Sequence, residues 1–257
     1  MLLFLLACHQ NISFETTSEN PTDAWSELVA EISQDDGIDF QTLKERRSVL
    51  EDYLAWVGDN GPRMNKRKNI KERRKGREDR RISHYVNAYN AWILYEILQA
   101  QPFDSIEGLE LAAFSLFGKA YRVDGEYLTL YHLKEERILG VYQEPLIHMM
   151  LHDGSMSSPK LQYWKLSQLD FTLKNRMRRY LGSEYGAKKV GEDWTLSALF
   201  QIEEDDFLYW SKSETLCQYL LDYAEKDLED WLNEQDQQNC QLNFQSWDYS
   251  LNQQKND

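Results

Sequence analysis

The chain has 257 residues, of which 42% are hydrophobic, so it can form a core and is not a disordered protein. Its formal net charge of −14 excludes general binding of nucleic acid, which needs a cationic surface to replace phosphate counterions. With 13% aromatic residues, the core is expected to contain large side chains whose polar tips need partners.

The first eight residues, MLLFLLAC, are apolar and end in a cysteine. Leu5, Leu6 and Ala7 before Cys8 resemble the signal of bacterial lipoproteins, whose cysteine is lipidated and becomes the mature N-terminus. A complete signal has a charged start and a longer apolar region, so we expect the true start to lie upstream. The resemblance implies a lipid-anchored protein of the bacterial cell envelope, and His9 favours the outer membrane, facing the periplasm. The alternative is a chance apolar N-terminus.

Residues 9–22 are polar and predict a flexible tether, and residues 63–81 form a basic arm with 11 Lys or Arg against 3 Asp or Glu. The arm therefore carries +8 and the rest of the chain −22, which adds up to −14. The plain interpretation is a solvated loop that leads into a helix. The alternative is contact with anionic lipid head groups, which attract clusters of Lys and Arg near a membrane.

Apolar periodicity predicts a single helix-rich domain over residues 23–252, followed by a tail at 253–257. Helices are expected over residues 23–33, 39–59, 82–102, 128–139, 165–182 and 214–233. Two alternating segments, 118–130 and 187–200, predict hairpins, the first with Asp124 and Gly125 in its tight turn. The apolar run LIHMML at 146–151 predicts a buried strand. The fold class is therefore α+β, with a small antiparallel sheet.

Two cysteines remain after Cys8, at positions 217 and 240. In an exported protein they can form a disulfide. Two separate buried thiols are the alternative, because free cysteine is among the most buried residue types.

Five blocks of the sequence follow one another in a recognisable order. They read YVNAYNAWILYEIL, YRVDGEYLTL, PLIHMMLHDGSMSSP, TLSALFQIEEDDF and WDYSLN. This succession resembles the family called domain of unknown function 547, over about residues 40–252. The resemblance implies no settled activity.

The central block departs from the pattern of that family at two positions. The family has a His, apolar residues, a Cys, a Gly, two residues, a Ser, a second Cys and a Pro. The matching residues are His148, Gly154, Ser157 and Pro159. Asp153 and Ser158 stand where the cysteines are usual, so a thiol role of the family cannot operate here. Glu135 is also displaced by about one position from the family's Ile-Glu pair.

The same stretch raises two catalytic hypotheses. A hydrolase would use His148 as a base and Ser155, Ser157 or Ser158 as the nucleophile, although the segment is not the G-x-S-x-G turn of hydrolases.

A metal site would use His148, His152 and Asp153, with His132 as a further candidate. Four-residue spacing puts the two imidazoles on one face of a helix or a strand. Catalytic zinc needs three protein ligands, so this local set is barely sufficient. We expect no metal and no cofactor.

The structural interpretation is favoured over both hypotheses. It expects a buried His148 whose ring meets a backbone carbonyl or an Asn, and an Asp153 carboxylate that accepts N–H bonds from the turn 154–158. Asn87 and Asn90 are expected to be buried, with at least one amide bonding residues 146–159 or 244–252.

Three further residues, Tyr89, Gly125 and Trp247, belong to the same structural motif, and the acids EEDD at 203–206 are expected to form a solvated face. The sequence thus predicts a lipid-anchored binding or scaffolding module with a degenerate family site. Its partner would be the membrane together with an unknown protein or small molecule, and not nucleic acid. The hydrolase centred on His148 and the metal-dependent site remain the alternatives.

Overall fold

The structure is a computed structural model that describes residues 10–15, 17–35, 37–62, 74–100, 105–106, 119–165, 169–236 and 238–254. Cys8 and the part of the basic arm before residue 74 lie outside the described residues. Among the described residues, no helix combines the length and the apolar character needed to cross a membrane.

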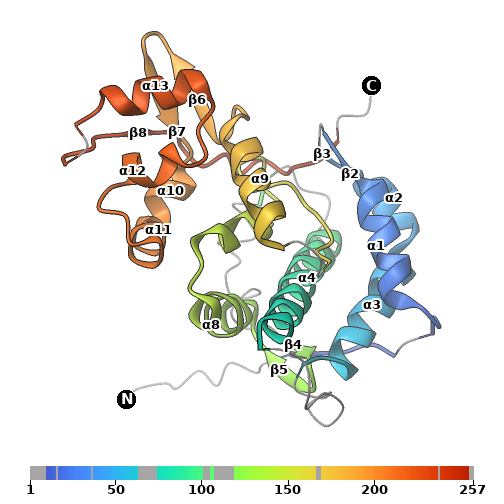
Figure 1. Ribbon diagram of the computed structural model, residues 1–257. Coiled ribbons are helices and arrows are strands. Elements are labelled where there is room, and N and C mark those ends of the chain that lie inside the picture. Colours follow the sequence, from blue (N-terminus) through green and yellow to red (C-terminus); the bar gives the residue numbers. More distant parts are fainter. Residues whose placement is uncertain are drawn as a thin grey trace, which may run out of the picture.

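The long helix α4 lies in the middle of the molecule, between two groups of shorter helices (Figure 1). It spans Arg74–Ala100, and its residues Val86, Ala91, Trp92 and Leu94 are completely buried. A helix that is apolar on nearly all sides needs cover on nearly all sides, as the sequence predicts for this segment.

Both groups of helices pack around α4. On one side lie α1 (Pro21–Ile32), α2 (Phe40–Glu45) and α3 (Arg47–Asp59). On the other side lies a continuous helical segment made of α7 (Leu130–His132), the π-helix η1 (Leu133–Leu139) and α8 (Gly140–Tyr142). Seven residues in π-helical geometry are unusual, and such segments are frequent at functional sites.

The C-terminal part forms a third group of helices, which begins with α9 (Figure 1). Its elements are α9 (Leu169–Leu181), α10 (Ala198–Ile202), α11 (Glu204–Ser211), α12 (Leu216–Leu221) and α13 (Lys226–Glu234). The predicted helix-rich α+β domain is confirmed.

Three small sheets complete the fold. Their strands are β1 (Gln10–Ile12), β4 (Lys119–Val123) and β5 (Glu126–Leu128); β2 (Ser33–Gln34) and β3 (Gly37–Ile38); and β6 (Ala187–Val190), β7 (Asp193–Leu196) and β8 (Asn243–Phe244). The two predicted hairpins, β4–β5 and β6–β7, are antiparallel as expected. Asp124 and Gly125 both have positive φ in the first turn, as a tight hairpin turn requires. Each hairpin also gains a parallel strand, β1 or β8, which the sequence does not predict.

The predicted strand over 146–151 is wrong. Residues Pro145–Met150 form a 3-10 helix, η2, in which all six residues are buried. Pro145 occupies a first helical position, where its missing N–H costs nothing, and the Glu144 side chain accepts from Leu146 N–H. A short run that is apolar on every side has no period, so its pattern suits a strand and a helical turn equally.

Two predicted helices are interrupted. The segment 39–59 bends at Arg46, and the segment 214–233 breaks between α12 and α13. In the second case, the two halves pack on different partners, α12 on α11 and α13 on β7. One straight helix could not place its apolar face on both, so tertiary packing overrides local propensity.

The last described segment returns from β8 across the molecule to β3 (Figure 1). On its way, Leu251 pairs with Ser155, and Asn252 N–H donates to Gly154 O at 2.8 Å. Further along, Gln253 pairs with Ile38. The C-terminal segment therefore clamps the central Gly/Ser turn to the N-terminal helices.

Cys217 and Cys240 form a disulfide, so the question that the sequence left open is answered in favour of pairing. The bond joins α12 to the segment that leads into β8.

Candidate functional site

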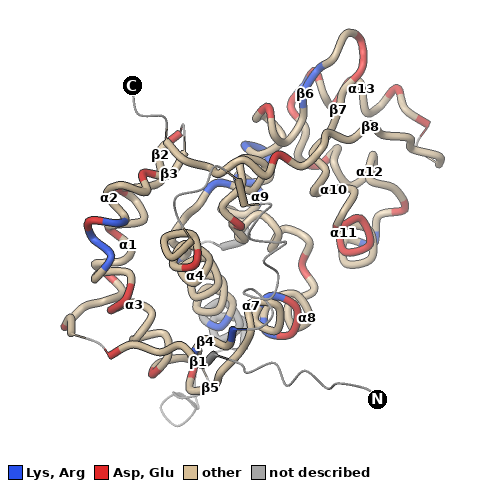
Figure 2. The backbone as a smooth tube through the Cα atoms, turned by 180° about the vertical axis from the view of Figure 1, so that it is seen from behind, with Lys and Arg blue, Asp and Glu red and all other residues tan. Residues whose placement is uncertain are grey.

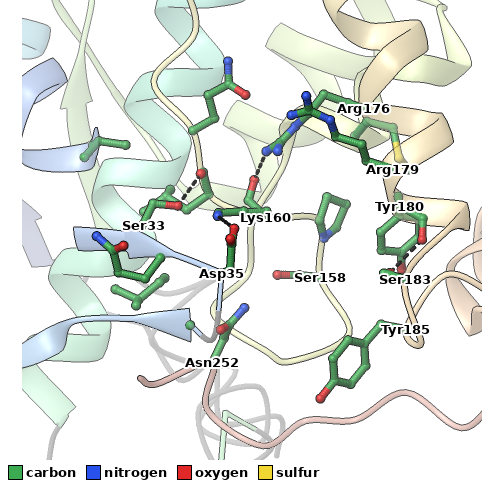
Figure 3. A pocket seen from close by; sticks show the side chains of 18 of the residues that line it. Ser33, Asp35, Ser158, Lys160, Arg176, Arg179, Tyr180, Ser183, Tyr185 and Asn252 are labelled. Atoms are coloured by element: carbon green, nitrogen blue, oxygen red, sulfur yellow. Dashed lines mark hydrogen bonds and ion pairs between the residues drawn. The ribbon is translucent and has the colours of Figure 1, made fainter. Parts of the chain in front are cut away.

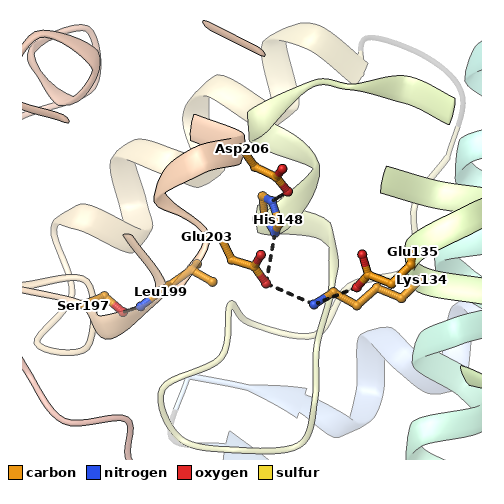
Figure 4. Close-up of polar contacts among 7 residues, drawn as sticks. All are labelled: Lys134, Glu135, His148, Ser197, Leu199, Glu203 and Asp206. Atoms are coloured by element: carbon orange, nitrogen blue, oxygen red, sulfur yellow. Dashed lines mark hydrogen bonds and ion pairs between the residues drawn. The ribbon is translucent and has the colours of Figure 1, made fainter. Parts of the chain in front are cut away.

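His148 lies on η2 with a side chain that is only 2% exposed. Its Nε2 is 3.0 Å from Asp206 Oδ2, and its Nδ1 is 4.0 Å from Glu203 Oε1 (Figure 4). The ring also stacks on Trp210, with centroids 6.1 Å apart. The imidazole points inward as expected. The expected backbone carbonyl or Asn partner is wrong, because the partners are the carboxylates of Asp206 on α11 and of Glu203 at the junction between α10 and α11.

These two carboxylates belong to the acidic run that the sequence interpretation assigned to a solvated face. Glu204 and Asp205 are indeed exposed, but Glu203 and Asp206 turn toward His148. Residues three apart lie on the same side of a helix, and Phe207 on that side is completely buried. Helical spacing within the run was therefore the signal that could have found both acids.

Lys134 completes the group from the π-helix η1. Its Nζ is 3.0 Å from Glu203 Oε1 and 3.6 Å from Glu135 Oε1 (Figure 4). Burial lowers the pKa of Lys134, but the nearby Tyr89 and Glu203 outweigh it, and the pKa is raised above its usual range. The ammonium therefore stays charged and fixes Glu203 beside the imidazole.

A cavity of about 230 Å³ opens over this group. Six of the residues singled out in the sequence line it, namely Tyr89, His148, Asp153, Ser158, Pro159 and Trp247. Lys134 and Glu203 supply charge, and Tyr249 adds a third aromatic side chain to the wall. Asp206 does not line the cavity, so it holds the far nitrogen of the ring and leaves Nδ1 on the cavity side.

The hydroxyls of the three candidate serines form hydrogen bonds with groups other than His148. Ser155 Oγ donates to Asp153 Oδ1 at 2.6 Å, and Ser157 Oγ accepts from Asp248 N–H at 2.8 Å. Ser158 Oγ lies 2.7 Å from His152 Nδ1 and donates to Ser155 O at 3.1 Å. None of these hydroxyls is hydrogen-bonded to His148, although all three residues are described.

The pair of Ser158 and His152 does not have the arrangement of a nucleophile and its base. His152 Nδ1 is also 2.9 Å from the carbonyl oxygen of Pro159, which can only accept. The proton therefore resides on Nδ1, and Nδ1 cannot take another proton from Ser158. Burial lowers the pKa of His152, against the opposing effect of the Asp153 carboxylate, so the ring is neutral.

The ligand set proposed from sequence for a metal is not assembled. Within the described residues, the group whose ligand atoms lie within 4.8 Å of one another consists of His148, Glu203 and Asp206. His152 faces Pro159, and His132 bonds Thr129 through Nδ1. Lys134 already neutralises Glu203 in this group.

The turn after His152 has the predicted structural chemistry. Asp153 Oδ1 accepts from Ser155 N–H at 2.8 Å. Gly154 has φ +94°, and a Cβ there would lie 2.3 Å from Ile97 Cδ1. Glycine is therefore required where the turn crosses α4.

Asn87 and Asn90 are buried, at 4% and 3% exposure, and both pin backbone segments to α4. The Asn90 amide donates to Met150 O and accepts from His152 N–H, which confirms the expected contact with residues 146–159. The Asn87 amide makes the same two kinds of bond to Trp164, beyond the expected segments. Gly125, in the β4–β5 turn, does not line the cavity.

Residues 74–181 match the family described as Protein of unknown function, DUF547. The match runs from α4 to α9 and is narrower than the resemblance drawn over 40–252. It contains Lys134 and His148 but not Glu203, Asp206 or Trp247, which complete the cavity and its acidic partners. Searches of curated proteins and of solved structures found no match to the chain.

Proposed function

We propose that this chain is a small-molecule-binding module built around a DUF547 domain and held at the bacterial cell envelope by a lipid on Cys8. The carrying observation is the convergence of Lys134, His148 and Glu203, from three separate segments, on one cavity. Buried or half-buried charged groups that converge on a cavity are the usual signature of a ligand site.

The lining of the cavity defines the chemistry of the ligand. Lys134 offers a positive charge, the imidazole offers a ring nitrogen for hydrogen bonding, and Glu203 offers an acceptor. Tyr89 and Trp247 offer flat apolar faces. A small polar molecule with one apolar or flat face, in the size class of an amino acid or a monosaccharide, fits this set. Binding rather than catalysis is favoured because the thiol positions are Asp153 and Ser158 and no candidate serine bonds His148.

A thermal-shift screen of the purified protein against the common amino acids and monosaccharides tests the proposal. At a hundredfold excess over Kd, a true ligand should raise Tm by about 5 to 10 °C. The variants Glu203→Gln and Trp247→Ala should lose most of this shift. The matched control is Glu204→Gln, one residue away and exposed, which should respond as the wild type does.

Two results would contradict the proposal. One is a screen in which no compound raises the Tm of the wild type. The other is labelling by a fluorophosphonate probe that a single Ser158→Ala change abolishes, because this would establish the serine hydrolase instead.

The envelope location is a separate part of the proposal. It is supported by the Leu5-Leu6-Ala7-Cys8 sequence and by the disulfide between Cys217 and Cys240, since disulfides persist in oxidising compartments. Labelled palmitate fed to the source cells should enter the wild type and not a Cys8→Ala variant. Equal labelling of both proteins would exclude the anchor.

The basic arm at 63–81 would then reinforce the anchor by contact with anionic lipid. In a liposome pelleting assay, the protein without its lipid should bind vesicles that contain phosphatidylglycerol more strongly than neutral vesicles. Added salt should weaken that binding, because it screens exposed charges.

A further inference from the structure

A second and larger cavity lies between α1, α9 and the loop after the central turn. Its volume is about 800 Å³, which is within the range of cavities that bind small organic ligands. Ser158 and Pro159 line both cavities, so the central turn forms the wall between them. The larger cavity plays no part in the proposed function above.

Three cationic side chains line this second cavity, in a protein of net charge −14. Arg176 and Arg179 are one turn apart on α9, and Lys160 comes from the loop opposite (Figure 3). Seen from behind, α9 carries blue segments, while Asp and Glu are scattered over many other elements (Figure 2). A local excess of positive charge is unexpected in so acidic a chain, and it favours the binding of an anion.

Within the part of the chain that the structure describes, Arg176 is incompletely satisfied. One of its five N–H groups donates to the carbonyl oxygen of Lys160, and its guanidinium lies over the Trp164 ring, 5.7 Å from the centroid. Among the described residues, neither Arg176 nor Arg179 forms an ion pair with a carboxylate. Burial, followed by repulsion from Arg179, lowers the pKa of Arg176 to about 10. A desolvated cation held beside a second cation is unfavourable unless an anion joins them.

The Lys160 ammonium can also exchange its present partner for a ligand. Its partner is Asp35, at 2.6 Å, whose carboxylate is fully exposed. Exposed ion pairs of this kind contribute little, so exchange of Asp35 for a bound anion costs little. Glu184 also lines the cavity, but its side chain is exposed, and the lining contributed by described residues keeps three cations against two carboxylates.

Part of the remaining wall is apolar and the rest is polar. Val29, Ile38, Met149 and Leu161 line the cavity and are each at most 3% exposed. We propose that this cavity binds an organic anion, with its phosphate or carboxylate group on Arg176, Arg179 and Lys160 and a short apolar chain against these residues. Guanidinium pairs bind both anions through parallel hydrogen bonds, and the apolar wall adds affinity for the chain.

Isothermal titration calorimetry with four probes tests the inference: octyl phosphate, octanoate, octanol and inorganic phosphate. Octyl phosphate and octanoate should bind, more weakly as salt is added, because charge–charge contacts are screened. Octanol lacks the charge and inorganic phosphate lacks the chain, so both should bind at least about tenfold more weakly.

Substitutions locate the site. Arg176→Gln and Arg179→Gln should each weaken octyl phosphate binding by about ten- to a hundredfold, the effect of removing a charge-assisted hydrogen bond. Arg179→Gln is the decisive variant, because Arg176 also supports Lys160 and Trp164 and its loss could disturb the loop. The matched control is Arg178→Gln, an exposed position on the same helix that does not line the cavity and should bind as the wild type does.

Three results would overturn the inference. They are no measurable heat with either anionic amphiphile, octanol binding as tightly as octyl phosphate, or unchanged binding to Arg179→Gln. Failure here would leave the proposed function untouched, because Glu203 and Trp247 do not line this cavity.

Discussion

The surroundings of His148 and of His152 differ although the two residues are four apart in one segment and are 2% and 1% exposed. His148 faces a cavity and is flanked by two carboxylates from the C-terminal helices. His152 is enclosed by the turn that follows it and bonds Pro159 and Ser158. Burial alone therefore does not separate a histidine of the candidate site from a structural one. The difference lies in which segments from other parts of the chain pack against each histidine.

The largest expected effect comes from removing the disulfide that supports the helices from which the two carboxylates near His148 come. The disulfide between Cys217 and Cys240 holds α12, which packs on α11 and so supports Asp206. Replacing both cysteines by serine should lower the free energy of unfolding by about 3 kcal/mol, from the loop entropy of a closed segment of this length. Urea denaturation measures this change. An unchanged midpoint would mean that the disulfide does not restrain α12 and the segment before β8.

The turn around His152 should be sensitive to the loss of its anchor on α4. In Asn90→Leu, Met150 O and His152 N–H lose their partner at a buried position. The free energy of unfolding should fall by about 1–3 kcal/mol. Asn233→Leu, at an exposed position on α13, is the matched control and should change stability by less than about 0.5 kcal/mol. If both variants are equally stable, the Asn90 amide does not hold the turn.

The neutral His152 should also make stability depend on pH. Its pKa is lowered in the folded protein, so the unfolded chain binds more protons between the folded pKa and about 6.5. Stability is therefore complete above pH of about 6.5 and falls on acidification, by at most about 1.4 kcal/mol per pH unit for one such group.

His84, whose pKa burial lowers to about 4, contributes in the same direction. In thermal unfolding followed from pH 7 to pH 5, His152→Gln should remove part of this slope and His84→Gln another part. A slope that persists unchanged in the double variant would assign the pH dependence to other groups.

The elements of the fold could largely be predicted from sequence where periodicity or turn chemistry was strong. The apolar pattern of α4 and the Asp124-Gly125 turn are examples, because each is encoded within a few neighbouring residues. The 3-10 helix η2 and the break after α12 could not be predicted. A short apolar run has no period, and the break arises from packing on two different neighbours.

Of the candidate site, only the residues that lie together in one sequence segment were predicted. His148, Asp153 and Ser158 were found from their own segment, and all line the cavity. Glu203 and Asp206 were missed as partners because they lie more than fifty residues further along the chain, in a run that also contains two exposed acids. The helical spacing of three between them was the available signal, and only the tertiary structure brings it to His148.

The central claim is that the cavity over His148 binds a small ligand while His152 only supports the fold. Nuclear magnetic resonance of protein with isotope-labelled histidine tests it directly, because the chain has five histidines and each can be assigned with a His→Gln variant. On titration with a compound that raises Tm, the side-chain signals of His148 should shift and those of His152 should not. The shift of His148 should be lost in Glu203→Gln and kept in Glu204→Gln. Equal shifts of both histidines, or a shift of His152 alone, would contradict the account.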